Sequence, residues 1–291
     1  MMVVYWRDKM KKYGKSIFGN ISVSVRIIAL VILSVIIPLI VVTALSLDTI
    51  SRTYDENMRN DMRSTVNNVA KDMESKMKAL KESALLISST DRIKEGIVHQ
   101  EAHKVIQYIT RTAGDMGLES IIVGGIDGKT IGRSDKPSGG VEDISGDRAY
   151  KAAVIGNVDG TIESDGKGIL IKAYGPIKAQ IEGKEVIVGA VIISRRISER
   201  DLAVFGGQGK KIIISNLEGR KTGEGLKLDR SSYMEAQQTL RNRLNTKVGT
   251  IICQMDTSKF QTAKKRLLGR TILINCLVAV PVLLLGLVLT W

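Results

Sequence analysis

Few residues of this chain have the types and spacing that metal binding or catalysis requires. His99 and His103 are its two histidines, and on a helix a spacing of four would place both on one face, with Glu101 between them. A zinc-protease helix needs Glu directly after the first His, where this chain has Gln100, and there is no third histidine. No nucleophile and base stand out as a pair. We therefore expect no metal, no cofactor and no enzyme activity.

The segment 124–130 (Gly-Gly-Ile-Asp-Gly-Lys-Thr) is superficially similar to a phosphate-binding loop. It is one residue short of the required Gly-x-x-x-x-Gly-Lys-Thr spacing, and a strand-like rather than a helical pattern follows it. Asp127-Gly128 between two apolar runs instead indicates a hairpin turn. A similar string returns at 212–223, which predicts two tandem modules that each open with such a hairpin.

Polar residues suited to line a small-molecule pocket are found in the first of these modules. An Arg offers a fixed fork of donors to a carboxylate, and a Tyr joins an apolar wall to one hydroxyl. The alternative is that Arg148 pairs with Asp147 or Asp143 on the surface and that the tyrosines are ordinary core residues. The candidates for ligand contact are Arg148, Tyr150, Lys172 and Tyr174.

Short elements must position these candidates. Their patterns predict a helix over 148–155, a strand over 168–174 that Pro176-Ile177 breaks, and a buried strand over 185–194. In the second module we expect a helix over 233–244 and a last strand over 249–255. Gly206, Gly207 and Gly209 mark a linker between the modules.

A long helix is predicted before the first module. Residues 47–90 contain neither Gly nor Pro, and apolar residues recur there at steps of three and four. This stripe could lie on the chain's own domain, or it could bury itself against a second copy in a dimer. Its members are Met58, Met62, Val66, Val69, Met73, Met77, Leu80, Ala84 and Ile87.

Two uncharged apolar runs, 27–47 and 271–291, have the length of a membrane-spanning helix. Much of the net charge of +13 lies beside them, in the basic tail of residues 1–26 and in the run from Lys264 to Arg270. Because of this distribution and the 4% aromatic content, we do not expect nucleic acid as a partner. The basic tail predicts a cytoplasmic N-terminus, so the segment between the runs would be extracytoplasmic. With Cys276 in the second run, Cys253 is left without an intramolecular partner there.

The order of several weak motifs resembles the Cache family, the extracytoplasmic PAS-like sensor domains of bacterial and archaeal receptors. The motifs are the Asp-Gly hairpin, 146–156 (Gly-Asp-Arg-Ala-Tyr-Lys-Ala-Ala-Val-Ile-Gly), 173–177 (Ala-Tyr-Gly-Pro-Ile) and 188–192 (Val-Gly-Ala-Val-Ile). The resemblance covers roughly 48–262, and the layout is similar to the double Cache type, although the second module is short. It implies a small-molecule ligand in the membrane-distal module, of the amino acid, organic acid or amine class, and a homodimer. It also implies ligand contacts on the 148–155 helix and the central strands.

The expected fold class is α+β: a long N-terminal helix and one or two PAS-like antiparallel-sheet modules, flanked by two transmembrane helices. We divide the chain into a basic cytoplasmic tail (1–26), a first span (27–47), a helical stalk (48–118), a membrane-distal module (119–200), a smaller membrane-proximal module (201–262) and a second span (271–291).

We expect a multi-pass protein of the cell membrane, the sensor part of a chemoreceptor or sensor kinase. Family members continue into a cytoplasmic output domain, which this sequence does not contain, so output from a separate signalling protein and a receptor fragment both stay open. The alternative function is a membrane-anchored adaptor or structural protein whose ectodomain binds another protein.

Overall fold

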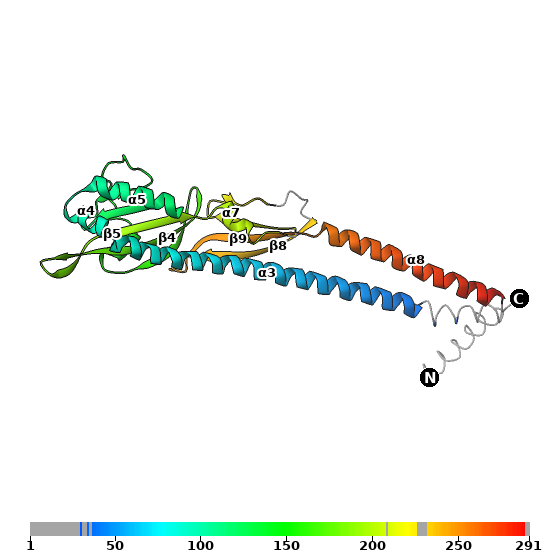
Figure 1. The fold of residues 1–291 in the computed structure, drawn as a ribbon. Coiled ribbons are helices and arrows are strands. Elements are labelled where there is room, and N and C mark those ends of the chain that lie inside the picture. The colour runs from blue at the N-terminus through cyan, green and yellow to red at the C-terminus, as the bar shows by residue number, and fades with distance from the viewer. Residues whose placement is uncertain (1–29, 31–33, 35–36, 208, 226–231, 289–291) are drawn as a thin grey trace, which may run out of the picture. The chain divides into compact units, whose positions relative to one another are not determined.

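The structure, a computed structural model, describes residue 30, residue 34 and residues 37–207, 209–225 and 232–288. They form two compact units, one made of residues up to 58 and from 257, the other of residues 59–256. Helix α3 (Ile37–Ser89) contributes to both (Figure 1). None of the described helices combines the length and the apolar character needed to cross a bilayer. Of the two predicted spans, residues 27–29, 31–33, 35–36 and 289–291 lie outside the described residues, as does the predicted tail 1–26.

The predicted long helix is confirmed as α3, and its apolar stripe is buried by the chain itself. In the larger unit, Met62, Val69 and Met73 are each 1% exposed and Ala84 is fully buried. Leu80, Ala84 and Ile87 share a core with the first sheet. The stripe therefore lies on its own domain, which is the first of the two alternatives.

The first module is a five-stranded antiparallel sheet in the order β2-β1-β5-β4-β3. Its strands are β1 (Ser120–Gly125), β2 (Thr130–Arg133), β3 (Asp159–Asp165), β4 (Gly168–Ile181) and β5 (Lys184–Arg196). One face packs on α3, α4 (Asp91–Val98) and α5 (Ala102–Met116) through Ile93, Ile109, Val123 and Val191. The other face is covered by α6 (Arg148–Val154) through Tyr150 and Ala153.

The β1–β2 turn is the predicted Asp-Gly hairpin. Gly128 has φ +81°, the left-handed conformation that such turns require, and the Asp127 carboxylate accepts the Lys129 amide at 3.1 Å. A strand follows the turn, so this segment is not a phosphate-binding loop.

Strand β4 runs through Pro176, so the break predicted at Pro176-Ile177 is wrong. Pro176 pairs with Ala190 of β5, and the register shifts directly afterwards, between Ile177 and Lys178. A bulge next to the proline lets the ladder continue around its missing N–H.

The second module is a four-stranded antiparallel sheet in the order β7-β6-β9-β8. Its strands are β6 (Lys210–Asn216), β7 (Lys221–Thr222), β8 (Tyr233–Arg241) and β9 (Lys247–Asp256), and α7 (Glu199–Ala203) precedes it. The helix predicted over 233–244 is therefore wrong. Residues from Tyr233 to Leu240 pair one for one with β9, and this pairing overrides the helix propensity of Glu, Ala and Gln. The two antiparallel sheets confirm the α+β class.

In the smaller unit, α3 and α8 (Ser258–Val288) come together near the start of α8. The rings of Tyr54 and Phe260 stack with centroids 3.6 Å apart and planes 5° apart. Lys264 donates to the Ser51 hydroxyl at 2.8 Å. These contacts join residues 51–54 of α3 to residues 260–264 of α8.

Candidate functional site

Helix α6 and the sheet strand β4 beneath it carry the four predicted ligand residues, Arg148 and Tyr150 on the helix and Lys172 and Tyr174 on the strand. Asp147 caps the helix by accepting the Ala149 amide at 2.7 Å. Directly paired residues of antiparallel strands point to the same side of a sheet. Tyr174 pairs with Ile192, which packs against α6, and Lys172 lies two residues away on the same face.

Tyr150 is a core residue of this arrangement. Its side chain is 4% exposed, and its hydroxyl donates to the carbonyl oxygen of Gly125 at 2.5 Å. Burial raises the pKa of Tyr150, although a backbone hydrogen bond opposes the shift. The ring lies so close to Gly124 that a Cβ there would contact it at 3.1 Å. Tyr150 thus fixes α6 to β1.

Lys172 lies between two carboxylates. Its ammonium is 2.5 Å from the Glu163 carboxylate on β3 and 4.0 Å from that of Asp147. All three side chains are partly exposed, between 21% and 39%, so solvent and a ligand can reach them. The cluster of Asp147, Glu163 and Lys172 carries one positive and two negative charges. We call it the α6 polar cluster.

Tyr174 and Arg148 flank this cluster in different ways. Tyr174 is half-buried against the Ala190 and Ile192 core, and burial raises its pKa. Arg148, the first residue of α6, is exposed, and its side chain makes no hydrogen bond or ion pair with any described residue. Neither of the surface pairs considered for it, with Asp147 or with Asp143, is formed. Its guanidinium is free to bind an anionic group.

Sequence reasoning missed Asp147 and Glu163. Asp147 precedes the predicted helix, where Asp is a favoured N-cap, and that signal was available. Glu163 lies on β3, whose pairing with β4 brings Thr161 opposite Lys172. No local pattern shows which strand neighbours β4, so the contact between Glu163 and Lys172 depends on the topology.

The two histidines lie on different elements. His99 is the C-cap of α4 and His103 is in α5, and Gln100 between them has φ +57°. The helix ends between them, so they do not share a helical face. The described part of the chain contains no group of three or more His, Cys, Asp or Glu side chains placed to hold a metal ion.

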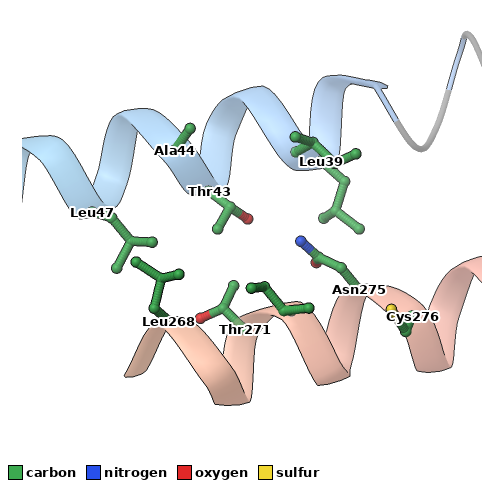
Figure 2. A pocket seen from close by; sticks show the side chains of 10 residues that line it. Leu39, Thr43, Ala44, Leu47, Leu268, Thr271, Asn275 and Cys276 are labelled. Carbon is green, nitrogen blue, oxygen red and sulfur yellow. The ribbon is translucent and has the colours of Figure 1, made fainter. Parts of the chain in front are cut away.

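A cavity of about 640 Å³ lies in the smaller unit, between α3 and α8. It is lined by Leu39, Ile40, Thr43, Ala44, Leu47, Leu268, Thr271, Ile272, Asn275 and Cys276. Figure 2 shows the Asn275 side chain directed into the space between the two helices. None of the described residues that line this cavity is charged, so these residues do not suit a charged metabolite.

Solved structures to which this chain is similar include sensor domains of bacterial receptors. The sensor domain of the histidine kinase DctB of Vibrio cholerae is 8% identical at a TM-score of 0.48, covering 69% of this chain and 98% of that one. The periplasmic domain of LuxQ from the same organism is 9% identical at 0.47, covering 68% and 100%. The sensory domain of the Campylobacter jejuni chemoreceptor Tlp3 with isoleucine bound is 12% identical at 0.41, covering 73% and 96%.

No protein-family model matches the chain, and no curated protein matches it in sequence. Solved structures to which the chain is similar include sensor domains of a histidine kinase and of a chemoreceptor.

Proposed function

We propose that this chain is the sensor part of a transmembrane receptor and that it binds a small molecule outside the cytoplasm without transforming it. The observation that carries the proposal is the α6 polar cluster, with the unpaired Arg148 beside it. Arg148 can bind a carboxylate through its fork of donors, and Asp147 can accept hydrogen bonds from an amine. These groups suit the amino acid, organic acid and amine class.

The sequence supports membrane anchoring as part of this proposal. The runs 27–47 and 271–291, which both include residues outside the described part of the chain, each contain no charged residue and are long enough to cross a bilayer as helices. The cytoplasmic end would act on an output domain or on a separate signalling protein. A homodimer is part of the proposal, but it would form through surfaces other than the α3 stripe, which the chain's own sheets bury.

A thermal-shift screen of the full chain in detergent tests ligand binding. A ligand at 100 times its dissociation constant should stabilise the fold by about 2.7 kcal/mol, which is several degrees. We expect a hit among amino acids, organic acids or amines, and we expect Arg148→Ala to abolish the shift. Arg92→Ala, a change of an exposed arginine on α4, should leave it intact. An unchanged shift in Arg148→Ala would remove Arg148 from the site.

An adaptor that binds another protein is the second candidate, and exposed apolar side chains of the first module favour it. Ile126 is 60%, Val141 72% and Ile155 75% exposed. If no compound stabilises the folded chain, while Ile155→Ser abolishes binding to a protein isolated with the wild-type chain, the adaptor replaces the small-molecule sensor.

A further inference from the structure

Helix α8 begins with a cluster of cations that has no acidic counterpart. The sequence from Ser258 to Trp291 contains neither Asp nor Glu. Lys264 is engaged with Ser51. The other four cations are exposed and form no ion pair with any described residue: Lys259, Lys265, Arg266 and Arg270.

Three of these cations share one side of the helix. Lys259, Arg266 and Arg270, with Ser258 and Thr262, line an open cavity of about 460 Å³. Residues four apart are neighbours on a helix surface, so the guanidiniums of Arg266 and Arg270 can reach the same anion. The Thr262 hydroxyl donates a hydrogen bond to the Ser258 carbonyl oxygen at 2.9 Å. The cations are therefore the groups that would bind an anion here.

The arrangement is unfavourable without an anion. Like charges at i and i+4 destabilise a helix, and no carboxylate of α8 offsets Arg266 and Arg270. A phosphate group removes this repulsion and matches the guanidinium fork, which binds it through two parallel hydrogen bonds.

The position of the cluster identifies where that phosphate comes from. Directly after Arg270, α8 continues from Thr271 to Val288 without a charged residue. A helix that enters a bilayer at this point holds the preceding cations at the level of the lipid headgroups. We propose that this face of α8, formed by Lys259, Arg266 and Arg270, binds the phosphate of anionic lipid headgroups. This inference rests on the membrane insertion in the proposed function.

The test is lipid selectivity of the full chain reconstituted in phosphatidylcholine vesicles. Electron paramagnetic resonance of spin-labelled lipids measures how much phosphatidylglycerol associates with the protein relative to phosphatidylcholine. We expect a severalfold preference for phosphatidylglycerol, falling toward equality in R266Q/R270Q, by up to about fivefold for each charge lost. The matched control R59Q/R63Q removes an exposed i, i+4 arginine pair of α3 and should keep the preference. Circular dichroism verifies that both variants are folded.

Each remaining outcome overturns the lipid site. A wild-type chain that floats with the vesicles but shows no preference contradicts the headgroup site alone. A chain that does not float with them contradicts membrane insertion and the site together. If millimolar inorganic phosphate abolishes the preference while chloride at matched ionic strength does not, the anion is free phosphate instead of a lipid. An equal loss in R59Q/R63Q would mean general charge attraction.

Discussion

Two tyrosines on the α6 side of the first sheet differ in what their hydroxyls do. The Tyr150 hydroxyl is buried and donates to Gly125, whereas that of Tyr174 makes no hydrogen bond with a described residue. Tyr150→Phe removes the shorter of the two hydrogen bonds that the Gly125 carbonyl oxygen accepts, the other coming from the Gly128 amide at 3.2 Å, so we expect a loss of about 1 kcal/mol in the free energy of unfolding. Urea denaturation of the ligand-free chain measures it.

Tyr174→Phe is the matched control for this measurement. It removes a hydroxyl from the same face and is expected to change the free energy of unfolding by less than about 0.5 kcal/mol. Equal losses in the two variants would show that the bond from Tyr150 to Gly125 does not hold α6 in place.

At the scale of elements, the contact between β1 and β5 depends on glycine. A Cβ at Gly189 would overlap the carbonyl oxygen of Gly124 on the paired strand. This oxygen belongs to the backbone, so it cannot move away without disturbing the pairing of the two strands. Gly189→Ala should therefore destabilise the chain by about 2–4 kcal/mol. Gly114→Ala, within α5 and with no heavy atom within 4 Å of its new Cβ, should instead stabilise it by up to about 1 kcal/mol. Thermal unfolding of the two variants measures both changes in stability. A Gly189→Ala variant as stable as the wild type would contradict the close contact between β1 and β5.

Elements with strong local signals could be predicted from the sequence. Helix α3 follows from a long Gly-free and Pro-free stretch with one apolar stripe, and the Asp127-Gly128 turn fixes the first hairpin. Strand β8 could not be predicted, because its Glu, Ala and Gln residues favour a helix until β9 pairs with them. Of the site, the residue types on α6 and β4 could be predicted, but Glu163 could not, because its place depends on strand order.

At the scale of the two modules together, charged groups join them. Asp201 of α7 accepts from Lys76 of α3 at 2.9 Å and from Arg195 of β5 at 3.0 Å. On the opposite side of β5, Arg196 binds Asp165, and the Asn216 amide of β6 donates to the Asp165 carbonyl at 2.8 Å. None of these long-range pairs has a local sequence signal.

These contacts predict acid sensitivity. Burial would raise the pKa of Asp201, but hydrogen bonds from Ser198 and Lys76 outweigh it and lower the pKa to about 2. The Arg196 hydrogen bond likewise lowers the pKa of Asp165 to about 2, against its burial. Both folded-state values lie below the usual 3.8, so their stabilisation is complete above about pH 4 and is lost as the pH falls toward 2. Asp201 contributes up to about 2 kcal/mol.

Asp201→Asn should reduce the loss of stability between about pH 4 and pH 2, and Asp165 is among the carboxylates that supply the remainder. Denaturant unfolding at several pH values measures the difference. Asp115→Asn, at an exposed pair with Arg111, should keep the wild-type pH profile. If Asp201→Asn keeps it as well, Asp201 does not join the modules in solution.

The buried stripe of α3 changes composition along its length, and this gives the helix a gradient of stiffness. The methionines Met62 and Met73, with Val66 and Val69 between them, occupy the part that begins where Lys210 of β6 binds Asp61, whereas no methionine is among Leu80, Ala84 and Ile87 beneath the first sheet. Thioether side chains repack at little cost, so the part with methionines is the more adaptable of the two. A force applied along α3 would therefore be absorbed as sliding at the methionine end, while the first sheet and the α6 polar cluster above it keep their geometry.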